Sequence, residues 1–584
     1  MGNVKLIEHP EELIPYMSML MRSKTLAVSI ETTGVDPRLD KVRFLLLAAE
    51  GAAYTLAVDC FSFMPKGLGL VREIFSAGTI KIFYDAKLQL QFLAAWDIFP
   101  HVLFDALLAA QLLHAVEGSY NAGLETLVAR YLPSEPGLSQ TSGKTIDWGG
   151  KIDDSQLGEA ARKTAVLPRL REAMIPHILR NGLVKVAGIE FQCVRAVAHM
   201  EYGGIQLDEQ KWRALLEATT QTRNSALQAL QPFLKDPVCI QNTLWGDEEV
   251  IGPNFDSSVF VLNLLRRNGI VVESTSRQAL YPYRSYPLVA ALSAYRKATK
   301  SVSSFLRPYL SMIHPVSGRL HPRYGQLAVF SGRMSCSAPN IQQIPREPAF
   351  RSCFNAPRGR SLILADYSQI ELRVAAQISE DRRMLAAYQA GEDLHLLTAS
   401  YLSGKPVHLV DKQERQAYKA VNLGLIYGMG AVGLQQTSQL TYGVDMPLGD
   451  AERFRKRFFE TYGGIAEWHR KIRSDTKREG RTLSGRKFAF GENAGLPERS
   501  NIPVQGTAAD IIKKALGLLV NAIEGSDARI VAAVHDEIVL ECDSSESEHM
   551  ASVLTNSMEE AANTILPLVP TSVKAVISES WAEK

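Results

Sequence analysis

Ser361-Leu-Ile-Leu-Ala-Asp-Tyr-Ser-Gln-Ile-Glu371 is the stretch that decides the fold of the second half of this 584-residue chain. The apolar run before Asp366 is typical of a buried strand, so we expect the aspartate at the end of a strand. Ser368 and Glu371 have capping-box spacing, which predicts a helix immediately afterwards. A carboxylate between a buried strand and a helix is a candidate functional group.

A second carboxylate, Asp536, lies in Ile530-Val-Ala-Ala-Val-His-Asp-Glu-Ile-Val-Leu-Glu541. Runs rich in β-branched residues flank it on both sides, so the segment predicts a hairpin that projects Asp536 from the sheet. Taken singly, either aspartate is more often a turn or cap residue than a metal ligand. The pair becomes informative through the segment that lies between them.

That segment, Arg415-Gln-Ala-Tyr-Lys-Ala-Val-Asn-Leu-Gly-Leu-Ile-Tyr-Gly428, predicts a helix with a cationic face. Asp411 and Glu414 have capping-box spacing at its start, and Gly428 indicates its end. Four residues recur at every fourth position and share one face about 18 Å long: Arg415, Lys419, Leu423 and Tyr427. The helix dipole disfavours cations in the early turns, so their placement there indicates an anionic ligand such as a triphosphate, against the alternative of a solvated face.

Together these segments resemble motifs A, B and C of the family A (bacterial DNA polymerase I-like) DNA polymerases, across most of residues 185–584. The resemblance implies a right-hand polymerase with a thumb at about 211–318, a palm at about 319–384 and 500–584, and fingers at about 385–499. It also implies a template-directed DNA polymerase, a nucleotidyltransferase that adds dNMPs to a primer 3′ end and releases pyrophosphate. Such an enzyme binds primer-template DNA and dNTPs and uses two Mg²⁺ ions, with Mn²⁺ as a substitute.

The resemblance assigns a role to each matching position. Asp366 and Asp536 hold the metal ions, and Glu537 and Lys419 join them as catalytic residues. The positions implied for dNTP binding are Arg415, Lys419, Leu423, Tyr427, His395, Glu371 and Gln369. Those implied for DNA binding are Arg333, Asn340, Gln342, Gln505, His535 and Asn501. Leu423 departs from the Phe or Tyr usual in the family, which predicts a looser contact with the incoming sugar.

The first part of the chain, residues 1–184, alternates short apolar runs with helical periodicity. Strands are predicted near Thr25–Ser29, Phe44–Ala49, Ala53–Val58 and Thr79–Phe83, and helices over Lys87–Trp96 and Leu103–His114. Residues 137–155 are rich in Gly, Ser and Thr and predict a loop. From about Val184 the pattern becomes helical, which places a domain boundary there.

Leu26-Ala-Val-Ser-Ile-Glu-Thr-Thr-Gly34 resembles the start of a DEDD-type 3′–5′ exonuclease, which implies a ribonuclease H-like α/β domain. Of the four carboxylates of that family only Glu31 remains, because Ser29, Gln89 and Lys163 stand at the other positions. One carboxylate and a lysine cannot hold two divalent ions, so we expect the fold without nuclease activity. The domain begins at the first residues of the sequence, which favours a large-fragment or phage-type member.

Bulk composition leaves these hypotheses open. The net charge of +2 does not itself indicate nucleic acid, but a local basic cleft would suffice. The cysteines are scattered without Cys-x-x-Cys spacing, and the sequence has no signal peptide, which predicts a cytoplasmic protein. It has no apolar run of about 18 residues, so no membrane span is expected. The protein is expected to be a monomer. Two alternatives to a polymerase remain: an active 3′–5′ exonuclease and a non-catalytic DNA-binding scaffold.

Overall fold

A computed structural model describes residues 3–117, 120, 122–135, 138, 147–234, 239–242, 248–251 and 253–582 of the chain. Its N-terminal domain is built on a six-stranded mixed sheet with the strand order β1-β4-β3-β2-β5-β6. The strands are β1 (Asn3–Ile7), β2 (Thr25–Thr32), β3 (Val42–Ala49), β4 (Tyr54–Asp59), β5 (Ile80–Phe83) and β6 (Leu103–Asp105). The predicted strands at Phe44–Ala49 and Ala53–Val58 correspond to β3 and β4, which are antiparallel neighbours.

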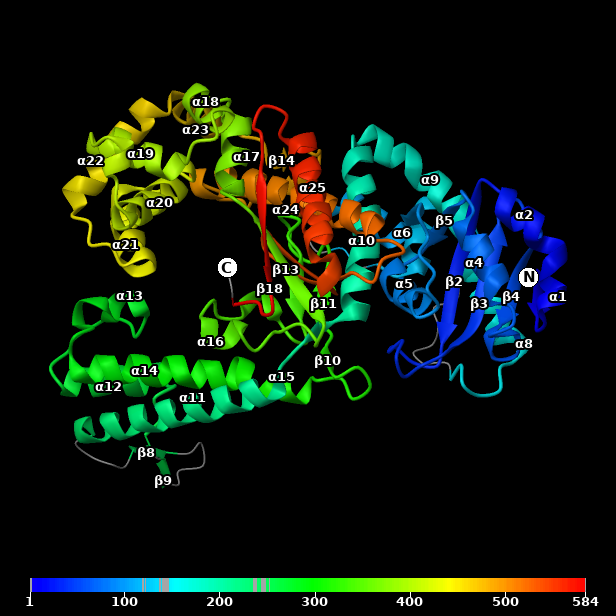
Figure 1. The fold of residues 1–584 in the computed structure, drawn as a ribbon, viewed down its shortest axis with the longest axis horizontal. Helices are drawn as coiled ribbons and strands as arrows, with labels where there is room; N and C mark the ends of the chain where they lie inside the picture. The colour runs from blue at the N-terminus through cyan, green and yellow to red at the C-terminus, as the bar shows by residue number, and fades with distance from the viewer. Residues whose placement is uncertain are drawn as a thin grey trace.

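Helices cover this sheet (Figure 1). They are α1 (Pro10–Leu13), α2 (Met17–Arg22), α3 (Cys60–Phe63), α4 (Leu68–Ser76), α5 (Ala86–Ala94), α6 (Ala106–Leu113), α7 (Leu124–Tyr131), α8 (Asp154–Ala165) and α9 (Leu167–Arg180). The prediction of one helix over Leu103–His114 is wrong at its start, since 103–105 form the edge strand β6. Asp105 ends this strand and caps α6 by accepting hydrogen bonds from the Leu107 and Leu108 amides. Residues 137 and 139–146 of the predicted loop at 137–155 lie outside the described residues. Residues 147–153 form no helix or strand, as predicted, but α8 begins at Asp154, inside the predicted loop.

Helix α10 (Val184–Gly203) joins the N-terminal domain to the rest of the chain (Figure 1). Val194 and Ala198 pack into the core of the N-terminal domain, whereas Cys193 and Val197 pack into the large core of the second half. The helix ends at Gly203, and the capping residue Gly204 has φ +63°; a Cβ there would lie 2.5 Å from the Leu320 carbonyl oxygen. Only glycine fits this conformation and this close approach.

A buried charged cluster also ties α10 to the second half. Glu190 on α10 accepts a hydrogen bond from the Lys513 ammonium at 2.7 Å and pairs with Arg486. Arg486 pairs in turn with Asp510 at 2.7 Å. These four side chains are fully or almost fully buried, so each charge depends on the others for its partner.

An arm of helices follows α10, and Asp208 caps its first helix by accepting from the Lys211 amide. Its helices are α11 (Glu209–Leu230), α12 (Ser258–Arg267), α13 (Arg277–Leu280), α14 (Pro287–Ser301) and α15 (Arg307–Ser311), with the strands β8 (Cys239–Asn242) and β9 (Glu248–Ile251). Leu230, Leu265 and Leu292 belong to a core of the arm's own. The arm is therefore a unit that meets the rest of the chain mainly at its base (Figure 1).

The second half centres on an antiparallel sheet with the order β16-β17-β13-β18. Its strands are β13 (Arg360–Tyr367), β16 (Arg529–Val534), β17 (Glu537–Asp543) and β18 (Val573–Ser578), packed with α17 (Ile370–Ser379), α24 (Leu496–Ala522) and α25 (Ser547–Ile565). Smaller elements are β7 (Ile205–Gln206), β10 (Arg319–Leu320), β11 (Arg323–Gly325), β12 (Ser335–Ser337), α16 (Pro348–Arg351), β14 (Glu479–Arg481) and β15 (Lys487–Ala489). The predicted strand before Asp366 and the hairpin around Asp536 are both observed.

A helical lobe lies across from the arm, on the same side of the central sheet (Figure 1). It consists of α18 (Arg382–Gln389), α19 (Leu394–Ser403), α20 (Lys412–Ile426), α21 (Ala431–Tyr442), α22 (Leu448–Thr461) and α23 (Gly463–Ser474). The predicted capping box at the start of α17 is wrong. Gln369 is the N-cap, in a left-handed conformation with φ +56°, and the Glu371 side chain bonds to Arg333 and Tyr427 instead.

Candidate active site

A cavity of about 780 Å³ opens where the central sheet meets α17, α19, α20 and α24. It gathers residues from segments that are distant in sequence. Eleven of the residues singled out by the sequence line it: Arg333, Gln342, Asp366, Gln369, Glu371, His395, Arg415, Lys419, Leu423, His535 and Asp536. The three sequence motifs therefore form one site in three dimensions.

The pairing of β13 with β17 brings the two aspartates together. Asp366 lies opposite Glu537 in the ladder, and the Tyr367 amide donates to the Asp536 carbonyl oxygen at 3.2 Å. Both aspartates also line a second cavity of about 230 Å³, which Glu537 shares. Glu537 is buried and accepts hydrogen bonds from Arg351 at 3.4 Å and from the Trp581 indole at 3.0 Å. It thus borders the aspartate pair without lining the larger cavity.

The donor set of the larger cavity fits a hard divalent cation. Magnesium is usually held in proteins by one or two carboxylates, with the remaining positions filled by water and substrate phosphates. The described residues contain no group of three or more His, Cys, Asp or Glu side chains placed to hold a metal. Asp366 and Asp536 supply two carboxylates on one open cavity, which is the arrangement expected when the substrate completes the coordination.

Helix α20 presents the cationic face that the sequence predicts. Its capping box between Asp411 and Glu414 is present, and Gly428 beyond its end has φ +75°. Arg415, Lys419 and Leu423 all line the cavity. The helix therefore places two cations in the same cavity as the two aspartates.

Asp393 is the anionic partner of Arg415. Its Oδ2 accepts from Arg415 Nη2 at 2.7 Å and from Nε at 3.0 Å. Its Oδ1 caps α19 by accepting from the His395 amide at 2.8 Å, and it also accepts from Gln369 Nε2 at 3.2 Å. Burial alone would raise the pKa of Asp393, but the bonds from Arg415 and from the α19 amides hold it below its usual value. The Asp393 carboxylate is therefore ion-paired with Arg415, the cation that the sequence assigns to a triphosphate.

His395 is only 3% exposed and lines the cavity. Burial lowers its pKa to about 4, and the neighbouring Arg415 and Lys419 cations act in the same direction, so the ring is neutral at pH 7. Asn422 Nδ2 donates to its Nδ1 at 2.9 Å, which leaves the ring proton on Nε2. The side chain is a neutral hydrogen-bond donor.

Glu371 joins three segments around the cavity. It pairs with Arg333 Nη2 at 2.9 Å through one oxygen and accepts from the Tyr427 hydroxyl at 2.6 Å through the other. Burial and the nearby Glu371 carboxylate raise the pKa of Tyr427, so this hydroxyl stays protonated. Tyr427 is not among the cavity-lining residues, although its hydroxyl bonds to Glu371, which is.

The residues singled out for DNA contact divide into two groups. Arg333, Gln342 and His535 line the cavity, and His535 has a left-handed φ of +59° in the turn of the hairpin. Asn340, Asn501 and Gln505 do not line it. The structure adds Arg346, which borders both cavities. It lies four residues after Gln342 in the sequence, and this proximity was the available signal.

The positions expected to form a nuclease site lie in the N-terminal domain, whose described residues include no group of three or more His, Cys, Asp or Glu side chains placed to hold a metal. Glu31 on β2 is close enough to Lys163 for the ammonium to favour its charged form, but burial dominates and raises its pKa to about 7. Lys163 also pairs with Glu125 at 3.2 Å and Glu159 at 3.4 Å. Gln89 Nε2 donates to the Tyr84 carbonyl oxygen at 2.9 Å, and Ser29 lies on β2 beside Ile30 and Glu31.

Residues 263–583 match the sequence pattern described as "DNA polymerase family A", and residues 4–153 match that described as "3'-5' exonuclease". The first match covers more than half of the chain. The chain belongs to DNA polymerase family A. The predicted order, an exonuclease-like domain followed by a family A polymerase domain, is confirmed.

Individual proteins that are similar to this family A chain support the same family assignment. It is 31% identical over 600 residues to "DNA polymerase I" of Aquifex aeolicus, a match that covers 98% of each protein. It is 37% identical over 325 residues to "DNA polymerase I, thermostable" of Thermus aquaticus, which covers 53% of this chain but only 38% of that protein. The fold resembles the solved "POL domain of Pol1 from M. smegmatis complex with DNA primer-template and dNTP", with a TM-score of 0.80, 24% identity and 99% coverage of both chains.

Within the described ranges, none of the helices of this family A chain combines the length and apolar character that crossing a membrane requires.

Proposed function

We propose that this chain is a template-directed DNA polymerase that adds dNMPs from dNTPs to a primer 3′ end. The observation that carries the proposal is the shared cavity. Asp366 and Asp536 line it together with Arg415 and Lys419 from α20. Carboxylates suited to divalent cations beside cations suited to a triphosphate are the parts that phosphoryl transfer requires. An intact set of this kind argues against a non-catalytic scaffold.

Family A polymerases depend on a divalent metal, and in this chain Asp366 and Asp536 would hold it. Mg²⁺ suits the two carboxylates best, with Mn²⁺ as a substitute. Bound there, the metal would lower the pKa of the primer hydroxyl and neutralise charge on the phosphates. Glu537, fixed by Arg351 and Trp581, holds the hairpin that positions Asp536.

The residues of α19 and α20 would bind the nucleotide. Arg415 and Lys419 neutralise the phosphate charge, and Lys419 donates a proton to the departing pyrophosphate. His395 remains neutral and donates from Nε2 to a phosphate oxygen. Arg415 must exchange its bond to Asp393 for one to the triphosphate, so nucleotide binding displaces a pre-existing ion pair.

The sugar and base would contact Glu371 on α17 and the C-terminal part of α20. Glu371 occupies the place of a ribose 2′-hydroxyl and is fixed there by Arg333 and Tyr427, which disfavours ribonucleotides. Leu423 packs beside the sugar, and Gln369 supports Asp393. Tyr427 and Gly428 at the end of α20 lie next to the templating base, and the glycine permits the helix end to move.

The nascent duplex would contact the remaining positions. Arg333, Gln342 and His535 reach the cavity, and their side chains can donate to minor-groove acceptors that occupy similar places in every correct pair. Asn340, Asn501 and Gln505 are assigned to the duplex by family resemblance alone. The arm acts as the thumb, the central sheet as the palm and the helical lobe as the fingers, in a cytoplasmic monomer.

Primer extension on a labelled template tests this function. Parent protein should extend the primer with dNTPs and Mg²⁺, whereas Asp366→Ala and Asp536→Ala should lose synthesis and keep DNA binding. Asp543→Ala is the matched control, because Asp543 lies exposed at the far end of β17 from Asp536. Incorporation by Asp536→Ala within about tenfold of the parent would refute the metal-site assignment.

For the N-terminal domain we infer a nuclease fold without nuclease activity. Glu31 is the single carboxylate left at the expected positions, and Lys163 lies where a cation would repel metal ions. Purified protein should therefore not shorten a 5′-labelled single strand in Mg²⁺. Shortening that Glu31→Ala abolishes would establish the alternative, an active 3′–5′ exonuclease.

A further inference from the structure

The arm joins the rest of the protein through a narrow neck. The chain enters the arm through β7 and leaves it through β10, and these strands pair antiparallel over only two residues each, Ile205 with Leu320 and Gln206 with Arg319. The base of the arm carries the α15–β10 loop, which includes His314. Any rotation at this short neck would move the whole arm, so contacts to the neck decide how firmly the arm is held.

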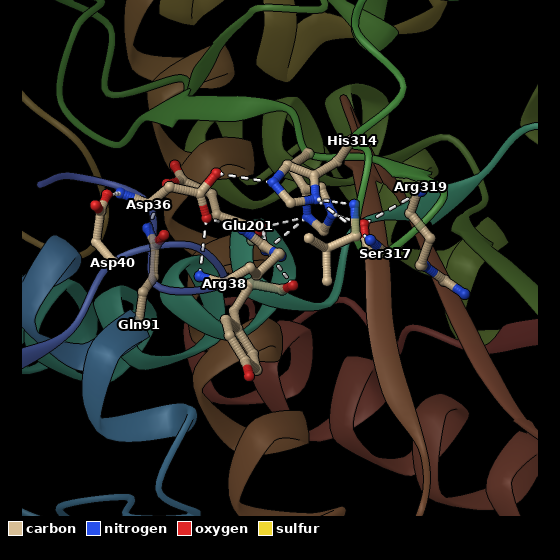
Figure 2. A network of polar contacts seen from close by, with 11 residues as sticks. Asp36, Arg38, Asp40, Gln91, Glu201, His314, Ser317 and Arg319 are labelled. Atoms are coloured by element: carbon tan, nitrogen blue, oxygen red, sulfur yellow. Dashed lines mark hydrogen bonds and ion pairs between the residues drawn. The ribbon is translucent and has the colours of Figure 1, made fainter.

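Arg38, in the N-terminal loop between β2 and β3, contacts both sides of the neck (Figure 2). Its Nη2 donates to the Glu201 carbonyl oxygen at 2.8 Å and to that of Tyr202, in the last turn of α10 before β7. The same nitrogen lies 2.6 Å from Nδ1 of His321, which directly follows β10. A guanidinium at a helix C-terminus satisfies carbonyls that lack helical partners and interacts favourably with the helix dipole.

Asp36 in the same loop holds the base of the arm. Its Oδ2 lies 3.0 Å from His314 Nε2, and its Oδ1 accepts from the Arg38 amide at 2.9 Å. The amides of Val316 and Ser317 donate to His314 Nδ1, which places the ring proton on Nε2 as the donor to Asp36. Only 10% of the Arg38 side chain and 11% of the His314 side chain are exposed. Loss of one partner would therefore leave a largely buried polar group unsatisfied.

A second set of contacts links the N-terminal domain to the active-site sheet through Glu201 and Tyr324. Lys87 and Gln91 on α5 donate to the two carboxylate oxygens of Glu201 at 2.9 and 2.6 Å. Glu201 also accepts from the Tyr324 amide at 2.7 Å, and the Tyr324 hydroxyl accepts from the Ala533 amide at 3.3 Å. Ala533 lies on β16, which leads into the turn at Asp536. The same contacts thus fix the neck against the sheet that carries the catalytic aspartates.

We propose that Asp36, Arg38, Lys87 and Gln91 form a brace by which the N-terminal domain positions the neck of the arm and prolongs the hold of the polymerase on its DNA. This rests on the proposed function, in which the arm is the thumb. The brace uses none of the expected nuclease positions, Ser29, Glu31, Gln89 and Lys163. A domain without nuclease chemistry would therefore still contribute to synthesis.

The test compares Arg38→Met with Arg43→Met in the full chain. Arg43 is a matched control because it also pairs with an aspartate, Asp59, at 2.8 Å, but entirely within the N-terminal domain. Two quantities are measured: release of a labelled primer-template into excess unlabelled DNA, and the single-turnover rate of the first incorporation. Arg38→Met should release DNA about threefold to tenfold faster and make shorter products per binding event, because charge-assisted bonds at the neck are lost.

The first incorporation by Arg38→Met should stay within about twofold of the parent, since the brace touches neither nucleotide nor metal ligand. Arg43→Met should match the parent in both quantities. Equal DNA release by Arg38→Met and Arg43→Met would overturn the brace. If Arg38→Met does not fold, Asp36→Asn combined with Lys87→Met is judged by the same criteria. A parent protein that fails to extend primers would refute the polymerase function. Because DNA release is measured without catalysis, the brace would still be judged from the release rates.

Discussion

Replacing Asp393 by asparagine should tighten dNTP binding. The side-chain oxygen that caps α19 is kept, because asparagine retains an acceptor for the His395 and Leu396 amides. The oxygen that accepts from Arg415 becomes an NH₂ group, which carries no charge and cannot accept from the guanidinium. Arg415 would then reach an incoming triphosphate without first leaving a carboxylate.

The size of the effect follows from the exposure of the pair. The Arg415 side chain is 38% exposed and that of Asp393 is 28% exposed, so solvent screens the interaction. Pairs of this kind contribute about 0.2–1 kcal/mol. Since about 1.4 kcal/mol is a factor of ten, the dissociation constant for dNTP should fall by about 1.5- to 5-fold.

The assay is single-turnover incorporation as a function of dNTP concentration, which separates nucleotide affinity from the maximum rate. Asp381→Asn is the matched control, since Asp381 likewise caps a helix, α18, through the Arg383 and Met384 amides. Its second oxygen accepts from the Gly464 amide, and no arginine of the described ranges pairs with it. Weaker dNTP binding in Asp393→Asn, with Asp381→Asn unchanged, would refute the reasoning. It would show that Asp393 holds Arg415 in its productive position and does not compete with the triphosphate.

Three further outcomes are expected. Leu423→Tyr should raise dideoxynucleotide incorporation relative to normal nucleotides by about three- to tenfold, because a tyrosine hydroxyl can replace the bond of the missing 3′-hydroxyl; equal dNTP/ddNTP selectivity in parent and variant would place residue 423 away from the sugar. Glu190→Ala should lower the free energy of unfolding by about 3 kcal/mol, since buried Lys513 and Arg486 lose a partner. Urea unfolding measures this loss, with Glu548→Ala, at an exposed position, as the control. A loss of stability no larger than that of the control would contradict the prediction. Burial raises the pKa of Glu31 from 4.5 to about 7, so the folded protein holds a proton that the unfolded chain releases, and the folded state loses stability as pH rises through 7. Glu31→Gln should therefore raise Tm at pH 8 and leave it nearly unchanged at pH 5. The opposite pH dependence would contradict the raised pKa of Glu31.

The sequence alone determined the elements whose signals are local. The apolar run before Asp366, the two β-rich runs around Asp536 and the capping box of α20 each predicted an element that the structure contains, because periodicity and caps act within a few residues. The shared face of α20 followed from helical geometry. Local signals also misled where a tertiary contact competed with them. Glu371 has the spacing of a capping box, but Arg333 and Tyr427 draw its side chain away from the helix start.

Only the tertiary structure decided which partners these groups meet. Asp393 and Arg415 are 22 residues apart, and Arg38 and His321 are 283 residues apart, so no sequence spacing relates them. The roles of Arg346 at the cavity and of the loop with Asp36 and Arg38 likewise depend on packing between distant segments. The physical reason is that a side chain's partner is set by the fold of the whole chain, whereas the type of element it stands on is set by its neighbours. The sequence therefore determined the family and the candidate catalytic groups, and the fold determined the ion pair between Asp393 and Arg415 and the contacts that hold the neck of the arm.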